Sequence, residues 1–166
     1  MIKKLFITGT GTDVGKTFVT ALLVKKMRQG GYNTGYYKPA LSGAVWKGKR
    51  LIPGDAEYVK SVAGIEKPAE EMVSYIYETA VSPHLASELE GTPVELQKVK
   101  VDFQAVCEEF DFVTVEGSGG IACPIRRDRY MMEDIIKALG CPILLIAPAG
   151  LGTVSDKMCI RDSYQR

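Results

Sequence analysis

A glycine-rich loop between a short apolar segment and a helical pattern limits the possible folds of this chain more than any other feature. Residues 4–8 (KLFIT) form the apolar segment, residues 9–17 (GTGTDVGKT) form the loop, and the helical pattern ends at Gly30 and Gly31. Glycines allow consecutive backbone N–H groups to turn toward a phosphate chain at a helix N-terminus, where the helix dipole also favours an anion. The order strand, loop, helix therefore predicts a phosphate-binding loop.

The end of this loop carries the residue types that bind a nucleotide with its metal ion. Lys16 supplies a positive charge for phosphate oxygens, and the hydroxyl of Thr17 can ligate Mg²⁺. The loop departs from the common Gly-x-x-x-x-Gly-Lys-Thr spacing, because Thr10 stands at the expected first glycine and Gly9 lies one residue earlier. The alternative is a glycine-rich turn with an incidental Gly-Lys-Thr, which the flanking strand and helix disfavour.

The rest of the chain alternates between short apolar segments and helical patterns. Extended segments are predicted at residues 34–37, 72–77, 112–115 and 143–147, and helices at residues 55–62, 94–110 and 131–139, with a further helix starting at Ser82-Pro83. The segments 112–115 and 143–147 are almost continuously apolar, as expected of strands covered on both faces. This alternation predicts an α/β fold with a doubly wound, mainly parallel sheet and helices on both faces.

Composition predicts one globular domain that binds anions only at a local site. The 166 residues are 46% hydrophobic and 25% charged, and the net charge of +1 gives no general attraction to nucleic acid or anionic membranes. No apolar stretch reaches the roughly 18 residues of a membrane span, and no signal peptide is evident, so we expect a cytoplasmic protein. The cysteines at positions 107, 123, 141 and 159 are far apart and are predicted to be reduced thiols.

Two carboxylates and a lysine are candidates for the same cleft as the loop. Glu116 ends the segment 112–115, and ligands of such folds bind beyond the carboxyl ends of the strands. A second glycine-rich loop, residues 117–120, follows it, and a carboxylate there can hold Mg²⁺ directly or through water. Asp55 is a second candidate, although a helix N-cap would explain it equally well. Lys38 would place an ammonium in the cleft, although a solvated lysine is more common.

Four segments resemble the signature segments of the dethiobiotin synthetase family and occur in the family's order. They are residues 9–17, 37–43 (YKPALSG), 82–87 (SPHLAS) and 115–120 (VEGSGG). The first, second and fourth are specific and the third is supportive, and the resemblance extends to about residue 155. It implies a P-loop NTPase fold and a cytoplasmic, homodimeric ligase of biotin biosynthesis with no nucleic-acid or membrane partner.

The resemblance also implies a reaction. It is the ring-closing carboxylation of 7,8-diaminopelargonate with carbon dioxide or bicarbonate to dethiobiotin, with conversion of Mg-ATP to ADP and phosphate. An amine of the substrate becomes a carbamate, the carbamate is phosphorylated, and the neighbouring amine closes the ring while phosphate leaves. Such chemistry needs cations arranged around the carbamate and the γ-phosphate.

Roles for individual residues follow from the same resemblance. The implied catalytic residues are Thr12, Lys16 and Lys38. The implied ATP-binding residues are Asp13, Val14, Gly15, Lys16, Thr17, Phe18, Asp55, Glu116, Gly117, Ser118 and Gly119. The implied Mg²⁺ ligands are Thr17, Asp55 and Glu116. The implied substrate-binding residues are Lys38, Ser42, Gly152 and Thr153, the last two holding the substrate carboxylate at a helix N-terminus of the partner subunit.

The C-terminal end departs from the family pattern, which continues with a long helix and a strand ending in an asparagine that reads adenine. We expect a C-terminally truncated domain at residues 1–156 and a non-native tail at residues 157–166. One alternative is a switch-type P-loop ATPase of the partition or septum-positioning class. Those proteins usually carry a second lysine early in the loop, where this chain has Thr10, Gly11 and Thr12. The other alternative is an inactive phosphate-binding fragment.

We expect no catalytic role for two other side chains, His84 and Trp46. His84 follows the Ser-Pro pair at a predicted helix start, and the implied chemistry needs no histidine, so we expect a structural or supporting role. Trp46 lies in a polar connection, where covering the substrate and being an ordinary, partly exposed aromatic are equally compatible with the sequence.

Overall fold

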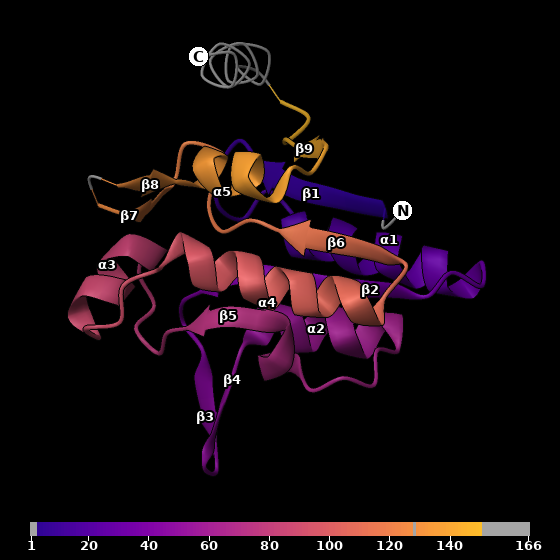
Figure 1. Ribbon diagram of the computed structural model, residues 1–166, viewed down its shortest axis with the longest axis horizontal. Helices are drawn as coiled ribbons and strands as arrows, with labels where there is room; N and C mark the ends of the chain where they lie inside the picture. Colours follow the sequence, from indigo (N-terminus) through magenta and orange to yellow (C-terminus); the bar gives the residue numbers. More distant parts are fainter. Residues whose placement is uncertain (1–2, 128, 151–166) are drawn as a thin grey trace.

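A five-stranded parallel sheet forms the centre of the computed structural model, which describes residues 3–127 and 129–150 (Figure 1). The strand order is β5-β2-β6-β1-β9, and every neighbouring pair is parallel. The strands are β1 (Lys3–Gly9), β2 (Thr34–Leu41), β5 (Val73–Ile76), β6 (Phe112–Glu116) and β9 (Ile143–Ile146). The predicted parallel sheet is confirmed, and its carboxyl ends gather at one edge.

Helices cover both faces of this sheet, as predicted. They are α1 (Lys16–Gln29), α2 (Gly54–Ala63), α3 (Pro83–Leu89), α4 (Leu96–Glu109), α5 (Met132–Leu139) and the 3₁₀ turn η1 (Ala69–Met72). One core joins the sheet to α1 and α2, and a second core on the other face joins it to α4 and α5 (Figure 1). None of the helices in the described part is long and apolar enough to cross a membrane.

Strand β2 shows how one segment serves both cores. All eight of its residues are buried, because it lies between β5 and β6 and under helices on both faces. Successive side chains of a strand point to opposite faces. Tyr36 accordingly belongs to the core under α1 and α2, whereas Tyr37 belongs to the core under α4 and α5. The predicted segment 34–37 was too short, since the strand continues through Lys38 to Leu41.

Two antiparallel hairpins were not predicted from the sequence. One is β3 (Val45–Lys47) with β4 (Arg50–Ile52), and the other is β7 (Pro124–Arg126) with β8 (Tyr130–Met131). Gly48 turns the first hairpin with a φ of 65°. Their strands have two or three residues and are mostly not buried, so they lack the apolar alternation that identifies a strand.

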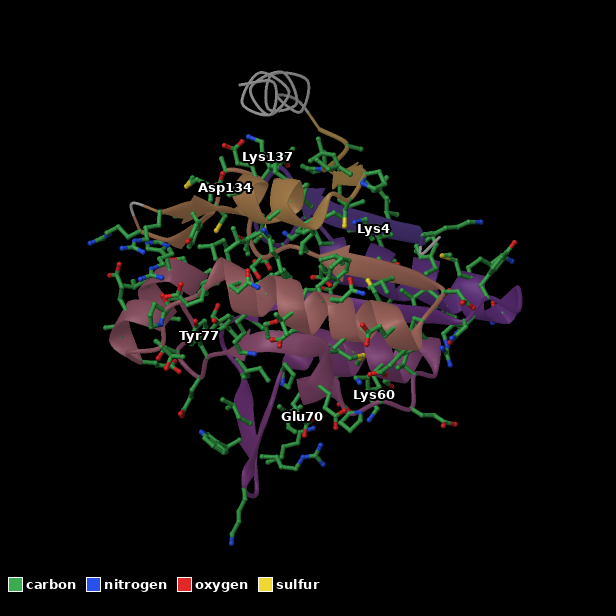
Figure 2. The ribbon with its side chains drawn as sticks, viewed as in Figure 1. Lys4, Lys60, Glu70, Tyr77, Asp134 and Lys137 are labelled. Carbon is green, nitrogen blue, oxygen red and sulfur yellow. The ribbon has the colours of Figure 1, made fainter. Side chains whose placement is uncertain are left out.

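The β3–β4 hairpin projects from the sheet and is tied to it by polar contacts. Arg50 pairs with Glu70 of η1, whose position is labelled in Figure 2. Trp46, which is 52% exposed, donates a hydrogen bond from Nε1 to Glu78 at 2.9 Å. The ring lines neither of the two cavities at the carboxyl edge of the sheet. Of the two alternatives for Trp46, an ordinary, partly exposed aromatic therefore fits the structure better than a ring that covers the substrate.

Candidate active site

The phosphate-binding loop connects β1 to α1 at the carboxyl edge of the sheet. Gly15, at the N-cap of α1, has a φ of 91°, and Asp13 has a φ of 57°. These left-handed conformations turn the loop around the start of the helix, where N–H groups lack intrahelical partners. A Cβ on Gly9 would lie 2.6 Å from Cγ2 of Val14. The glycine that departs from the common spacing is therefore required by the close approach of the loop to its own strand.

The second glycine-rich loop packs directly against the first. A Cβ on Gly120 would lie 3.2 Å from the carbonyl oxygen of Gly9 and 3.3 Å from that of Thr10. Gly119 has a φ of 66°, which a residue with a side chain rarely adopts. The two loops thus form one continuous wall at the ends of β1 and β6.

A cavity of about 350 Å³ opens over the phosphate-binding loop and collects most of the residues that the resemblance implied. Its walls come from the phosphate-binding loop, from α1, β2, α2 and the end of β6, and from the second glycine-rich loop. The lining residues are Thr12, Asp13, Gly15, Lys16, Thr17, Phe18, Lys38, Asp55, Glu116, Gly117 and Gly119. Val14 does not line this cavity but packs near Gly9, and Ser118 lines the neighbouring cavity described below. Gly152 and Thr153, together with the predicted tail, lie outside the described residues.

A buried cluster of opposite charges forms the floor of this phosphate cavity. Nζ of Lys38 lies 2.7 Å from Oδ2 of Asp55 and 2.8 Å from Oε1 of Glu116. Lys38 and Glu116 are almost completely buried. Burial alone would lower the pKa of Lys38, but the two carboxylates outweigh it and raise the pKa above its ordinary value, so the ammonium stays charged. The solvated lysine considered as an alternative is wrong.

Asp55 takes part in this cluster and does not cap its helix. Pro53 occupies the N-cap position of α2, and Asp55 lies in the first turn with its carboxylate directed to Lys38. The N-cap alternative for Asp55 is therefore wrong. An acidic side chain in the first turn still interacts favourably with the helix dipole, which helps α2 to hold it there.

Lys16 is folded back onto its own loop. Its Nζ donates a hydrogen bond to the carbonyl oxygen of Gly11 at 2.6 Å. Burial lowers the pKa of Lys16, and the nearby ammonium of Lys38 lowers it further. Lys16 and Lys38 thus place two ammonium groups at this cavity, next to the carboxylates of Asp13, Asp55 and Glu116, and an ammonium is a point charge suited to phosphate oxygens.

Glu116 is held on both of its carboxylate oxygens. Oγ1 of Thr17 donates to Oε1 at 2.7 Å, and the hydroxyl of Tyr36 donates to Oε2 at 3.0 Å. Burial, together with the charge of Glu116, raises the pKa of Tyr36 well above its ordinary value, so the phenol keeps its proton and donates a hydrogen bond. Sequence reasoning missed Tyr36. The available signal was the two-residue period of β2, which places Tyr36 and Lys38 on the same face.

The oxygen donors of this floor fit a magnesium ion. Thr17, Asp55 and Glu116, the three predicted ligands, all line the phosphate cavity, and the two carboxylates already share one cation, the ammonium of Lys38. Within the described ranges no group of three His, Cys, Asp or Glu side chains is placed to hold a metal ion by itself. The floor supplies two carboxylates and a hydroxyl, and Mg²⁺ typically takes one or two carboxylates and completes its shell with water and phosphate oxygens.

A second cavity of about 380 Å³ adjoins the phosphate cavity and shares Thr12, Lys38, Asp55 and Gly119 with it. Its other lining residues are Leu41, Ser42, Ala80, Val81, Ser82, Pro83, Ser118 and Cys123. The hydroxyl of Ser42 donates to the carbonyl oxygen of Val81 at 2.6 Å, which ties the end of β2 to the segment before α3. This cavity, called the side cavity below, combines apolar walls with a charged end at Lys38.

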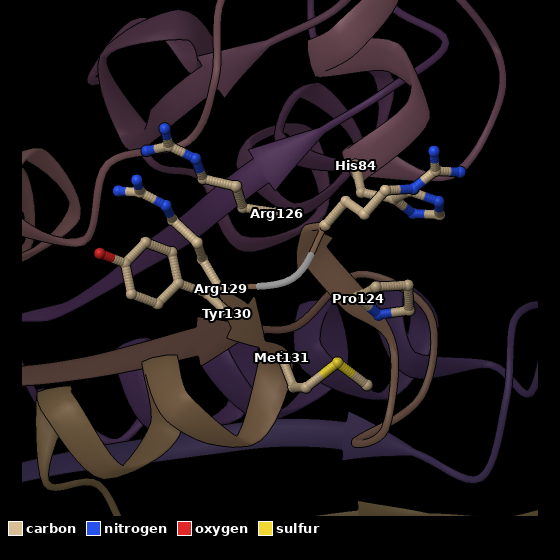
Figure 3. A pocket seen from close by; sticks show the side chains of 7 residues that line it. His84, Pro124, Arg126, Arg129, Tyr130 and Met131 are labelled. Atoms are coloured by element: carbon tan, nitrogen blue, oxygen red, sulfur yellow. The ribbon is translucent and has the colours of Figure 1, made fainter.

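A third cavity, of about 430 Å³, lies at the β7–β8 hairpin and is separate in its lining from the other two (Figure 3). It is lined by His84, Pro124, Arg126, Arg127, Arg129, Tyr130 and Met131. Among the described residues Nδ1 of His84 has no hydrogen-bond partner, and the side chain lines neither the phosphate cavity nor the side cavity. The thiols of Cys107, Cys123 and Cys141 are free, as predicted, and Cys159 lies outside the described residues.

Fold and site together define a P-loop nucleotide-binding protein of the α/β class. A family model described as an AAA domain matches residues 3–165. The chain also resembles a solved structure, the kinase domain of the Escherichia coli tyrosine kinase ETK, with a TM-score of 0.52 and 17% identity over 98% of this chain and 62% of that one. At this identity the likeness shows the fold alone.

Curated relatives identify the family. The chain is 49% identical to the ATP-dependent dethiobiotin synthetase BioD of Clostridium botulinum strain Loch Maree, over 94% of this chain and 70% of the relative. It is 51% identical to the BioD of strain Eklund 17B, over 93% of this chain and 69% of the relative. The chain belongs to the ATP-dependent dethiobiotin synthetase family, a family of ligases, which confirms the family predicted from the four sequence segments.

Proposed function

We propose that this chain catalyses the ATP-dependent ring closure of 7,8-diaminopelargonate with carbon dioxide to dethiobiotin, a step of biotin biosynthesis. The observation that carries the proposal is the position of Lys38. Its buried ammonium lines both the phosphate cavity and the side cavity, so one cation faces the site for the nucleotide and the site for a second molecule. A switch-type ATPase needs no such shared cation.

ATP binds in the phosphate cavity in this proposal. Lys16 exchanges the carbonyl of Gly11 for oxygens of the β- and γ-phosphates, and the N–H groups at the start of α1 contact the same phosphate chain. Thr17, Asp55 and Glu116 are the residues that would hold Mg²⁺. When bound, the ion neutralises charge on the phosphate oxygens.

The diamine binds in the side cavity. The apolar walls at Val81 and Pro83 suit the alkyl chain of the substrate, and Thr12 and Lys38 lie at the end shared with the nucleotide. We also propose that Gly152 and Thr153 of a partner subunit hold the far carboxylate, which makes the working form a homodimer.

The reaction then proceeds in three balanced steps. An amine nitrogen bonds to the carbon of carbon dioxide and loses a proton, which gives a carbamate. A carbamate oxygen bonds to the γ-phosphorus while the bond from that phosphorus to ADP breaks. The neighbouring amine bonds to the carbamate carbon, loses a proton and expels phosphate, which closes the ring. Lys38 faces the carbamate and the transferring phosphoryl group and stabilises the negative charge that they bring together.

Phosphate release from Mg-ATP tests this proposal directly. We expect release by the purified chain only when 7,8-diaminopelargonate and bicarbonate are both present, with one dethiobiotin formed per phosphate. Lys16→Ala should lower the rate by about 10²- to 10³-fold, because it removes a preorganised cation from the phosphates. Release that is indifferent to the diamine would favour the switch-type ATPase, and no release under any condition would favour the inactive fragment.

A further inference from the structure

Tyr36 lies behind the site and lines neither of its two cavities, although it contacts a central residue. Its side chain is completely buried on β2, under α1 and α2. Its hydroxyl donates to Oε2 of Glu116 at 3.0 Å, and the carboxylate itself is only 1% exposed. A buried carboxylate needs a donor on each oxygen, since an unsatisfied charged oxygen is costly in a protein interior.

The three donors to Glu116 differ in what else they do. Thr17 and Lys38 donate to Oε1, and both also have roles in the proposed reaction, at the metal ion and at the transferring phosphoryl group. Among the described residues Tyr36 alone donates to Oε2, and it faces neither cavity. It is therefore the donor that can hold the carboxylate in one orientation while Thr17 and Lys38 change partners.

We propose that Tyr36 is a positioning residue that fixes Glu116 so that Oε1 faces the metal-bound nucleotide. This inference rests on the proposed function, because it takes Glu116 as part of the magnesium site. Outer-shell partners of metal ligands affect metal affinity by roughly 10- to 100-fold. The loss of the Tyr36 hydroxyl should therefore weaken the coupling between metal and nucleotide without altering the phosphate-binding loop.

The neighbouring tyrosine offers a matched control. Tyr37 is also buried, but it points to the opposite face, where its hydroxyl donates to the carbonyl oxygen of Val99 at 3.0 Å and shares a hydrogen bond with Ser74. Tyr36→Phe and Tyr37→Phe each remove one buried hydroxyl from the same strand. Only the first removes a contact to Glu116.

The experiment measures the dissociation constant of ADP by isothermal titration calorimetry, once with Mg²⁺ and once with EDTA. In the unaltered chain and in Tyr37→Phe we expect the same gain in affinity from Mg²⁺. In Tyr36→Phe we expect this gain to fall by roughly tenfold, while the affinity in EDTA stays within about twofold. If Tyr36 had only a structural role, Tyr36→Phe would change the unfolding temperature as Tyr37→Phe does, and the gain in ADP affinity from Mg²⁺ would stay the same in both variants.

Further outcomes separate this inference from the proposed function. If the unaltered chain shows no magnesium gain, the proposed metal site fails and the inference fails with it. If the unaltered chain shows the gain and Tyr36→Phe keeps all of it, only the positioning role is overturned. A double-mutant cycle with Glu116→Gln gives an independent measure. In the Glu116→Gln background, Tyr36→Phe should cause almost no further loss of the gain in ADP affinity from Mg²⁺. Additive losses of this gain in the double variant would contradict the inference.

Discussion

Charged side chains gather in two parts of the molecule and are held there in opposite ways. On the floor of the phosphate cavity, the side chains of Lys38 and Glu116 are 4% and 1% exposed, and their charged atoms lie 2.8 Å apart. At the β7–β8 hairpin, the side chains of Arg127 and Glu88 are 64% and 41% exposed, and their charged atoms lie 3.6 Å apart. Figure 3 labels two other arginines of this hairpin, Arg126 of β7 and Arg129 of the turn.

The two ion pairs differ in how much the fold depends on each partner. A buried ion pair has given up its hydration, so the removal of one partner leaves an uncompensated charge. An exposed pair keeps its water and contributes little. The same kinds of charged group are therefore mutually dependent in the phosphate cavity and independently hydrated at the hairpin. Three predictions test this difference, starting with the largest expected effect.

Lys38→Met should have the largest effect, because it leaves the carboxylate of Glu116 buried beside Asp55 without its cation. We expect a loss of about 3–5 kcal/mol in the free energy of unfolding, measured by urea denaturation, together with loss of diamine-dependent phosphate release. The double variant Lys38→Met/Glu116→Gln is the control and should recover much of the stability but none of the activity. An unchanged unfolding midpoint in Lys38→Met would contradict the description of the pair as coupled and buried.

Alkaline pH should destabilise the chain because the buried phenols of Tyr36 and Tyr37 resist deprotonation in the folded state. Burial raises the pKa of Tyr36 and of Tyr37 above the ordinary value of 10.0. Above about pH 10 the unfolded chain loses these protons while the folded chain keeps them, so stability is fully present below that pH and falls above it. The slope should approach about 1.4 kcal/mol per pH unit for each tyrosine.

Urea denaturation between pH 8 and pH 11 measures this decline. Tyr36→Phe and Tyr37→Phe should each make it shallower. The raised pKa of Lys38 acts in the same direction, since its stabilisation is present below the unfolded pKa of 10.5 and is lost as the pH rises through the folded one. A decline as steep in both tyrosine variants as in the unaltered chain would mean that neither phenol is protected.

Arg127→Ala at the hairpin should have the smallest effect. Its partner Glu88 stays in water after the substitution, so we expect the free energy of unfolding to change by less than about 0.5 kcal/mol. The rate of diamine-dependent phosphate release should also stay the same, because Arg127 lines neither the phosphate cavity nor the side cavity. A large loss of rate with normal stability would show that the hairpin belongs to the working site after all.

The sequence predicted those parts of the site that follow from local pattern. The strand before the loop, the Gly-Lys-Thr end and the place of Glu116 at the end of β6 all depend on neighbours along the chain. The contact between Tyr36 and Glu116 depends instead on the order of strands in the sheet, which places β2 beside β6. Gly9 departs from the common motif because of a contact with Val14 that only the folded loop creates. The direction of the Asp55 carboxylate likewise could not be predicted locally, because it is set by the ammonium of Lys38 on another element.

The shared wall at Lys38 has a thermodynamic consequence for the two ligands. One ammonium borders both the phosphate cavity and the side cavity, so a ligand that attracts it in one cavity alters the field in the other. Binding of the two ligands is then heterotropically linked, and reciprocity requires each to change the affinity of the other by the same factor. The affinity of the proposed nucleotide would therefore depend on whether the proposed diamine is bound, and the reverse. Each affinity has to be measured both with and without the other ligand.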